Sequence, residues 1–308
     1  DGQTAPDAGA PRVLRVSGSS FAHTCALLAA GTVRCWGVND NGQLGIALAE
    51  SRQQCRVPES TPAVNLPCEL TPRDVPGLSD VADIAAGNGG TCALKRDGSL
   101  WCWGANDVGE LGQGNNDTTA HPTPTRVNLP AVRQVAYGAF HVCALLVDGT
   151  VQCWGNNKFG QGGTAPAMSD MQCDPGDGET AACLLRPRAV PGITNARQVT
   201  AGRNHSCALL MDGTVRCWGL NDSAQLGNGM VEDQDHPHPA PVAVTGLSDV
   251  TQVSAGGSHT CARRSDGSVH CWGWNDVGQL GTAPTTACTL PGADAFQCAR
   301  APVAVPEL

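Results

Sequence analysis

Short runs of alternating apolar and polar residues, separated by glycine-rich turns, dominate the chain. The run from Cys25 to Gly37 is representative: two alternating stretches flank a turn that ends at Gly31. Successive side chains of a strand point to opposite faces, so each stretch predicts a half-buried β-strand. Apolar residues at helical spacing are absent. The pattern therefore predicts an all-β protein.

The same run occurs five times. The first cysteines of the copies are 51 to 67 residues apart, a period that suits propeller blades and is too long for helical repeats of about 34 residues. The copies run from Cys25 to Gly37, Cys92 to Gly104, Cys143 to Gly155, Cys207 to Gly219 and Cys261 to Gly273.

A second phrase follows each copy, for example Asn275-Asp276-Val277-Gly278-Gln279-Leu280-Gly281. The joined phrase Trp-Gly-x-Asn-x-x-Gly-Gln-Leu-Gly resembles the repeat of the regulator-of-chromosome-condensation family, over residues 12–308. The resemblance implies a β-propeller of four-stranded blades. Two features depart from the family pattern: its best-known members have seven blades, and they lack the doubled cysteine found here in every repeat.

The two cysteines of each run are predicted to form a cross-strand disulfide. If Ala29, Ala30 and Gly31 form a three-residue turn with a left-handed glycine, Cys25 lies directly opposite Cys35. Opposed residues of a non-hydrogen-bonded pair are close enough for a bridge. The same register predicts the bridges Cys25–Cys35, Cys92–Cys102, Cys143–Cys153, Cys207–Cys217 and Cys261–Cys271.

The other six cysteines also fall into local pairs. Each pair lies in a long segment of the first, third or fifth repeat (residues 46–75, 164–190 and 282–301), and the pairs are Cys55–Cys68, Cys173–Cys183 and Cys288–Cys298. Eight local bridges indicate an extracellular, cell-surface or periplasmic protein. The resemblance together with this pattern suggests a secreted, disulfide-rich, bacterial-type member. Zinc binding is disfavoured because no Cys-x-x-Cys pair exists.

We predict a single closed five-blade propeller of four antiparallel strands per blade, with repeats at about 13–79, 80–131, 132–194, 195–248 and 249–308. Residues 1–11 read as a flexible tether left after processing, with arbitrary trimming as the alternative. The stretch Pro302–Val305 matches Pro241–Val244, so we expect it to join residues 13–36 in one composite blade that closes the ring. An open or dimer-completed assembly is the alternative.

Composition limits the classes of partner that the chain is expected to bind. The net charge is -9 with 19 Lys and Arg residues, and phosphate binding needs a basic surplus, so a nucleic-acid partner is disfavoured. No apolar stretch approaches the ~20 residues of a membrane span. We expect a monomer that needs no cofactor and binds a protein partner.

Recurring residues favour structural roles, because repeat-specific chemistry should appear in one copy. His23, His141, His205 and His259 are expected to make hydrogen bonds within their blades rather than a catalytic or metal ring. The recurring tryptophans are expected to pack between blades; they are Trp36, Trp103, Trp154, Trp218 and Trp272. Arg263 interrupts the apolar face of its hairpin and has no explanation in the sequence.

Residues that do not recur are the candidates for binding. Trp101, Trp274 and Phe159 are the candidate partner contacts, with surface packing as the alternative for the tryptophans. The segment from Glu232 to His238 is the densest cluster of acidic residues and histidines. Its Asp233, Asp235, His236 and His238 are weak candidates for a divalent cation; a solvated loop is the favoured interpretation, and our prediction names no metal site.

Three functions remain open. The favoured one is a non-enzymatic protein-interaction scaffold, a surface receptor or an enzyme inhibitor, which binds through the three stapled segments on one propeller face. The second is an extracellular enzyme that acts on a polymer across that face, although we find no nucleophile elbow, phosphate loop or His-Glu-x-x-His motif. The third, guanine-nucleotide exchange or chromatin binding, follows from the family name and is opposed by charge and compartment.

Overall fold

The structure is a computed structural model, and it describes residues 11–19, 23–57, 64–174, 180–283, 287–292 and 294–306. The predicted tether at residues 1–11 lies almost entirely outside these ranges. Two 3-10 turns, η1 (Leu48–Glu50) and η2 (Pro166–Met168), are the helical segments of the described chain. In that part of the chain, no helix is long and apolar enough to cross a membrane.

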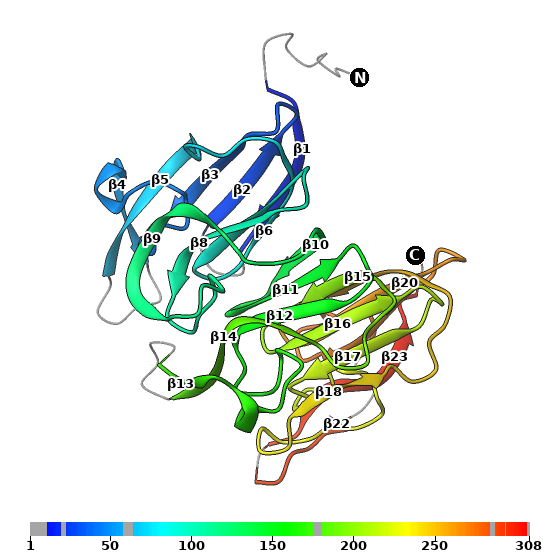
Figure 1. The fold of residues 1–308 in the computed structure, drawn as a ribbon. Helices are drawn as coiled ribbons and strands as arrows, with labels where there is room; N and C mark the ends of the chain where they lie inside the picture. The colour runs from blue at the N-terminus through cyan, green and yellow to red at the C-terminus, as the bar shows by residue number, and fades with distance from the viewer. Residues whose placement is uncertain are drawn as a thin grey trace, which may run out of the picture.

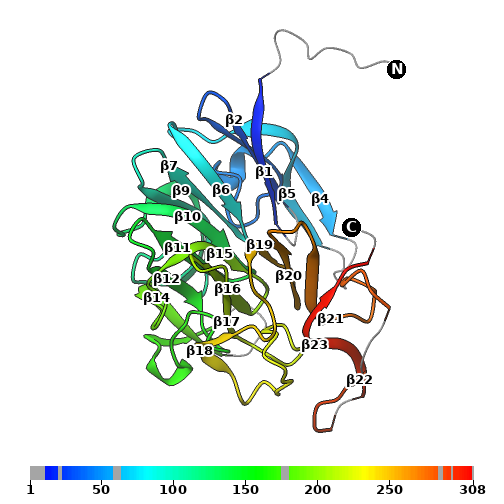
Figure 2. The ribbon, with the colours of Figure 1, turned by 90° about the vertical axis from the view of Figure 1, so that its right-hand side faces the viewer.

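Five antiparallel sheets follow one another along the chain and fan around a common centre (Figures 1 and 2). Each sheet holds one copy of the repeat, and we call it a blade, numbered one to five in chain order. The first three strands of each blade are joined by short turns, as the alternating pattern requires, and a longer segment leads from the third strand to the fourth. The all-β prediction is confirmed.

The strands of blades one and two, in the order in which they pair, are β1 (Val13–Gly18), β2 (His23–Leu28), β3 (Val33–Val38), β5 (Val64–Asp74) and β4 (Gln53–Val57), then β6 (Val81–Ala86), β7 (Gly90–Lys95), β8 (Leu100–Asn106) and β9 (Asp117–Arg126). Those of blade three are β10 (Val132–Tyr137), β11 (His141–Leu146), β12 (Val151–Asn156), β14 (Ala181–Ala189) and β13 (Met171–Cys173). Those of blades four and five are β15 (Ala196–Ala201), β16 (His205–Leu210), β17 (Val215–Gly219) and β18 (His238–Ala243), then β19 (Val250–Ala255), β20 (His259–Arg264), β21 (Val269–Trp274), β23 (Phe296–Ala304) and β22 (Ala287–Cys288).

The register of the central hairpin is the predicted one. Cys25 pairs with Cys35 and Leu27 with Val33, and Gly31 has φ of 77° at the end of the turn. The paired cysteines bring their Cα atoms to 4.1 Å, close to the spacing of a non-hydrogen-bonded pair. All eight predicted disulfides are present.

Blades one, three and five have five strands instead of the predicted four. The additional strands β4, β13 and β22 come from the stapled segments, and each lies at the outer edge of its sheet beyond the fourth strand. Their cysteines are not directly opposed: Cys55 pairs with Leu66 and Cys68 with Gln53. The wider Cα separations of 5.8 to 6.1 Å follow from this offset register.

The core lies between blades, as the alternation predicts. Leu27 and Val33 of blade one pack in one buried cluster with Val81, Ile84 and Trp103 of blade two. Equivalent clusters join blades two and three, three and four, and four and five. Each blade therefore depends on its neighbour for the burial of one apolar face.

The predicted ring closure is not found. The stretch from Pro302 onward belongs to β23 and pairs with β21 of its own blade, with Val303 opposite Cys271. Blade one is completed by β5 of its own repeat, so the expected composite blade is wrong. Across the described ranges, no strand of blade one pairs with a strand of blade five. The match between Pro302–Val305 and Pro241–Val244 reflects equivalent fourth strands, not a strand missing from blade one.

The blade disulfides should matter more for stability than the staples of the inserted segments. We expect the double variant Cys143→Ala/Cys153→Ala to lose about 2–4 kcal/mol of unfolding free energy, because both cysteines belong to the large apolar cluster that joins blades three and four, whereas Cys173 and Cys183 belong to a small one. Urea unfolding measures the loss. Cys173→Ala/Cys183→Ala is the matched control, since it opens a bridge of the same sequence separation at the sheet edge. An equal loss in both variants would contradict this assignment.

Candidate binding face

The stapled segments and the inner turns lie at the same end of the blades. In each blade the turn between the first and second strands meets the end of the third strand, as the pairing of His23 with Gly37 shows. The fifth strands are paired with the part of the fourth strand that extends past this end. We call this end of the molecule the mouth face, and the end with the hairpin turns the back face.

A cavity of about 420 Å³ lies on the axis at the mouth face. The turns of the five blades line it, mostly with glycine and alanine, and the larger side chains in its wall are Asn88, Tyr137, Phe140 and Arg203. A second axial cavity is lined by the innermost strands β1, β6, β10, β15 and β19. The five blades therefore share one axis, as expected for radially arranged blades.

A smaller pocket of about 280 Å³ lies beside the axis, between blades four and five. Trp274 and Phe296 of blade five form its aromatic wall, and Arg203 and Asp222 of blade four contribute opposite charges. The Trp274 indole donates a hydrogen bond of 2.8 Å to Asp276, which fixes the ring. Arg203 lines both this pocket and the axial cavity.

The three candidate aromatic contacts are not brought together. Trp274 is at the mouth end of β21, whereas Trp101 is near the back end of β8, where its indole donates to Ser99 and Lys95 lies 5.0 Å above its ring. Phe159 is 9% exposed, so its ring offers little surface to a partner. Of these three residues, only Trp274 lies in a described pocket together with other residues that do not recur between repeats.

The candidates found from the sequence did not include Arg203, Asp222 and Phe296. A signal for Arg203 was present: the residue after the turn glycine is Asn88, Ala139 or Gly257 in other repeats, and only blade four places a cation there. The contact between this turn and the inserted segment of blade five depends on the fold, so the sequence did not reveal it.

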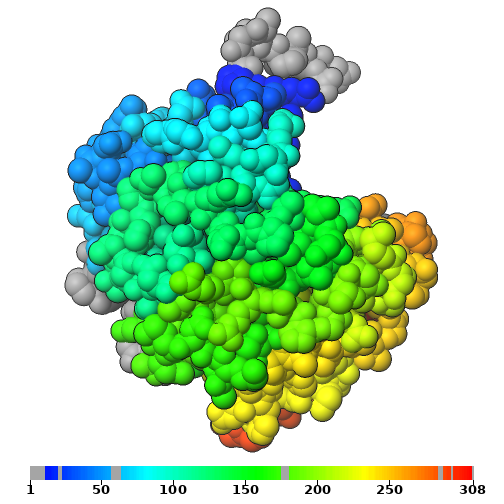
Figure 3. Space-filling view, in the orientation of Figure 1, coloured from blue at the N-terminus to red at the C-terminus, as the bar shows by residue number. Residues whose placement is uncertain are grey.

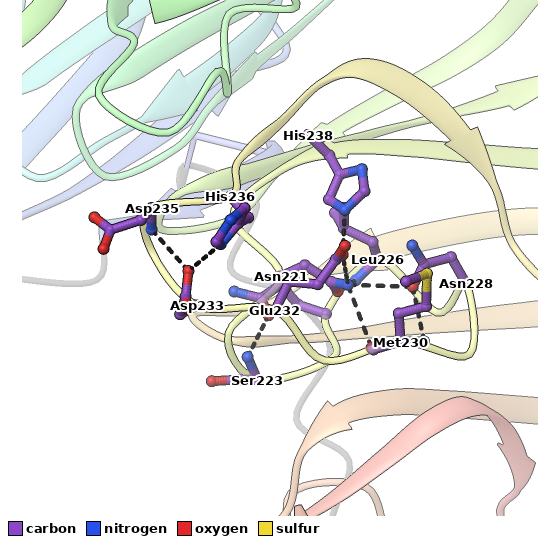
Figure 4. A network of polar contacts seen from close by, with 11 residues as sticks. Asn221, Ser223, Leu226, Asn228, Met230, Glu232, Asp233, Asp235, His236 and His238 are labelled. Atoms are coloured by element: carbon purple, nitrogen blue, oxygen red, sulfur yellow. Dashed lines mark hydrogen bonds and ion pairs between the residues drawn. The ribbon is translucent and has the colours of Figure 1, made fainter. Parts of the chain in front are cut away.

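The acidic loop of blade four is held by its own ion pairs (Figure 4). His238 pairs with Glu232, which also accepts a hydrogen bond from Asn221, and His236 lies 2.6 Å from Asp233. Within the described ranges, no three metal-ligating side chains form a cluster. The carboxylates here hold the loop together through the two histidines.

Blade two has the same arrangement in place of a staple. His121 lies opposite Gly104 in the register, as His238 lies opposite Gly219, and His121 is 2.9 Å from Asp117. The two blades without an inserted disulfide thus hold their loops by an acid–histidine pair. Hydrogen bonds from Thr119 and His121 hold the pKa of Asp117 down at about 2, against the opposing effect of partial burial.

Three of the four recurring histidines bridge blades, so the expected bonds within a blade are wrong for them. His23 Nε2 is 2.9 Å from the Thr91 hydroxyl of blade two, and that hydroxyl donates to the main-chain carbonyl of Gln43. Because the hydroxyl proton is used, Nε2 carries the hydrogen that His23 donates. His141 with Ser206 and His205 with Thr260 repeat this contact.

The recurring tryptophans donate to the same carbonyl. Trp103 Nε1 is 2.9 Å from the Gln43 oxygen of the preceding blade, and Trp154, Trp218 and Trp272 bond equivalently to Glu110, Gln161 and Gln225. These four tryptophans are fully buried. The prediction of inter-blade packing is confirmed for them, and we call this set of contacts the blade junction.

The junction between blades two and three replaces both polar partners at once. Gly90 stands in place of the histidine, and Val142 stands in place of the hydroxyl residue. The Tyr137 hydroxyl occupies the freed space, since a Cβ added to Gly90 would lie 2.3 Å from it. Glu110 also replaces the glutamine found in the other four loops. Burial raises the pKa of Glu110 to about 7.

Five antiparallel blades around one axis define a β-propeller, here an open arc. The sequence matches the family model of the RCC1-like domain over residues 5–308, and the chain belongs to the RCC1-like domain family. It is 30% identical over 283 residues to the ultraviolet-B receptor UVR8 of Arabidopsis thaliana, covering 91% of this chain and 57% of that protein.

Solved structures show the same fold. Prp20p of Saccharomyces cerevisiae aligns with a TM-score of 0.74 at 23% identity, covering 96% of this chain and 66% of Prp20p. Human WBSCR16 aligns with a TM-score of 0.70 at 24% identity, covering 96% and 67%. The chain therefore spans 57% of UVR8 and just under two thirds of Prp20p.

The junction histidines should make the fold acid-sensitive. Burial lowers the pKa of His141 to about 4 and that of His205 to about 3, so between these values and 6.5 the unfolded chain binds more protons. Stability is then full above pH 6.5 and is lost as pH falls toward 4. We expect His205→Gln to reduce the slope of the unfolding free energy against pH, taken at pH 5, by about 1.4 kcal/mol per pH unit. Urea titrations from pH 4 to 8 measure it; an unchanged slope would refute the assignment.

Glu110 should have the opposite effect. Its folded-state pKa of about 7 exceeds the ordinary 4.5, so unfolding releases a proton between those values and stability falls as pH rises through that window. We expect Glu110→Gln to stabilise the protein increasingly from pH 4.5 to 7, by up to about 3 kcal/mol above pH 7. Thermal unfolding at pH 5 and 8 tests this. Glu50→Gln, at an exposed position, is the control and should show no such difference.

Proposed function

We propose that this chain is a non-enzymatic protein-interaction scaffold that binds a partner protein through its mouth face. The pocket between blades four and five carries the proposal. It combines aromatic surface from Trp274 and Phe296 with the charges of Arg203 and Asp222. Aromatic and arginine side chains in a partly enclosed site are typical of residues that dominate protein interfaces.

The loops around this pocket are pre-organised. Phe296 lies within the inserted segment of blade five, inside the loop that the Cys288–Cys298 bridge closes. Asp222 precedes the ion-paired loop of blade four. Loops that are already ordered lose less conformational entropy when a partner binds. The stapled segments therefore favour recognition by a rigid surface.

Two solved relatives support a binding role. The structure of Prp20p is described with its binding properties to Gsp1p and histones, and another structure shows Kap60 bound to yeast RCC1. Those partners are properties of those proteins. What we carry over is that a propeller of this family serves as a binding platform.

We place the protein in an extracellular, cell-surface or periplasmic setting, as a monomer. All sixteen cysteines are bridged, and such bridges persist in oxidising compartments. The chain's acidic balance favours a protein partner over nucleic acid.

The test is capture of a partner from the secreted and envelope fractions of the source cells by the oxidised protein. We expect Trp274→Ala and Arg203→Ala each to weaken binding of the captured partner by about 30-fold, the effect of losing an interface hot spot. Calorimetry with the purified partner measures this. Trp101→Ala on the back face is the matched control. A partner that tolerates both mouth-face variants but not Trp101→Ala would overturn the proposal.

A further inference from the structure

The two axial cavities meet at one layer of the innermost strands. The cavity at the mouth face has a volume of about 420 Å³ and the one below it about 320 Å³. Gly18, Ala86, Tyr137 and Ala201 line both cavities, and we call the two together the axial passage. Figure 3 shows the surface hollowed between blade one, in blue, and the orange residues of blade five. The innermost strands lie on that side of the molecule in Figure 1, so solutes can reach the axis.

Hydroxyl groups of one blade bind main-chain N–H groups of the next blade along this passage. The Ser17 hydroxyl accepts a hydrogen bond of 3.0 Å from the N–H of Ala86, and the Thr200 hydroxyl accepts one of 3.0 Å from the N–H of Ala255. Ser17 and Thr200 hold the same register position, opposite the first cysteine of their hairpins. The inner edge of a blade therefore finds an acceptor on the preceding blade where this position carries a hydroxyl.

Alanine replaces the hydroxyl residue in blades two and three. Ala85 and Ala136 hold this register position, and an alanine side chain has no acceptor atom. The N–H groups that would bond there belong to Tyr137 and Ala201, and neither has another partner among the described residues. An N–H group that faces a cavity without a protein acceptor binds water or a ligand oxygen. Two such donors therefore lie in adjacent blades at the layer where the cavities meet.

Arg203 gives the axial passage its net charge. It lines the mouth end, and its guanidinium forms no hydrogen bond or ion pair within the described ranges. The other arginine of the lining, Arg15, is 2.7 Å from Asp83, which offsets its charge. Asp222 lines only the neighbouring pocket. The passage thus combines one net positive charge with two unpaired N–H donors, in a chain whose net charge is -9.

We propose that the axial passage is a binding site for a carboxylate group. The carboxylate oxygens take the place of the missing hydroxyls and accept from the N–H groups of Tyr137 and Ala201, and Arg203 supplies the opposite charge. Hydrogen bonds to an ionised acceptor are stronger than those between neutral groups, and a guanidinium matches the planar carboxylate. A single net charge fits a monoanion better than a phosphate dianion.

The carboxylate belongs to a free organic acid or to an acidic side chain of a protein, since both present the same group. The site shares Arg203 with the pocket between blades four and five, but it needs no protein partner. It therefore goes beyond the proposed scaffold function and can be tested apart from it.

The experiment follows main-chain amides by nuclear magnetic resonance of the isotope-labelled, oxidised chain. The protein is titrated at pH 7 and constant ionic strength, in sodium chloride, with sodium acetate and separately with the blocked peptide acetyl-Ala-Ala-Glu-Ala-Ala-amide. We expect saturable downfield shifts of the amide protons of Tyr137 and Ala201. The amides of Ala86 and Ala255 are internal controls and should shift little, because they already bond to hydroxyls.

Two variants separate the charge from the N–H donors. Arg203→Gln should weaken binding of the probe that saturates the site by about 10-fold, whereas Arg56→Gln, which removes an exposed charge from the outer strand β4, should leave it unchanged. Ala136→Ser supplies a hydroxyl at the position of Thr200, so it should abolish the shift of Ala201 and also weaken binding by about 10-fold. The other three blades have serine or threonine at this position, so we expect this variant to fold.

The two probes distinguish the source of the carboxylate. Saturation by acetate identifies a free organic acid as sufficient, and saturation by the peptide alone identifies an acidic side chain; either result supports the site. Equal shifts with sodium sulfate, or with the same peptide carrying glutamine, would contradict the assignment to a carboxylate. Amides of Tyr137 and Ala201 that respond to neither probe would show that the donors bind water only. Binding that is unchanged in Arg203→Gln would also overturn the proposal.

Discussion

The main-chain carbonyl of the loop glutamine or glutamate is the contact on which the architecture depends. In the junctions where a hydroxyl residue is present, this oxygen accepts from the next blade's tryptophan and hydroxyl, as Gln43 does from Trp103 and Thr91. A carbonyl oxygen has two lone pairs, so both are used in a fully buried position. The loop that carries it is held by Asn39, whose side chain bonds Leu44 and Ile46. The recurring asparagine, glutamine, tryptophan and histidine are therefore all parts of the blade junction, which joins a blade to its neighbour.

The loops that follow the blade junction are held by two kinds of contact. In blades one, three and five a disulfide closes the inserted segment, and in blades two and four an acid–histidine pair takes its place. Reduction would release the first kind and leave the second intact. Protonation of Asp117 at low pH would weaken an ion pair and leave the bridges intact. An oxidising and near-neutral environment is the condition in which both kinds of contact are intact.

The hairpin register and its five bridges could be predicted because they are local: ten residues and a three-residue turn determine which cysteines meet. The three bridges of the inserted segments were predicted only because the six remaining cysteines fall into local pairs along the chain. The inter-blade hydrogen bonds could not, since the sequence shows that His205 recurs but not that its partner Thr260 lies 55 residues away. The prediction of a composite blade that closes the ring was wrong for a related reason. The resemblance of Pro302–Val305 to Pro241–Val244 identifies an equivalent strand, but it does not say which blade that strand joins. Only pairing in space distinguishes a fourth strand of blade five from one of blade one.

The candidate pocket illustrates how a repeat can carry a single site. Its side chains do not recur, yet their positions are set by the contact that does: Arg203 and Asp222 belong to blade four, Trp274 and Phe296 to blade five, and the Trp272–Gln225 bond fixes these two blades against each other. Trp274 lies two residues after Trp272, so any change in that junction moves the aromatic wall relative to the charges. The repeated residues thus determine the geometry of the pocket, and the non-repeating residues determine what it recognises. Substitutions at Trp272 and at Trp274 therefore differ in kind: the first alters the fold that presents the pocket, and the second alters only its surface.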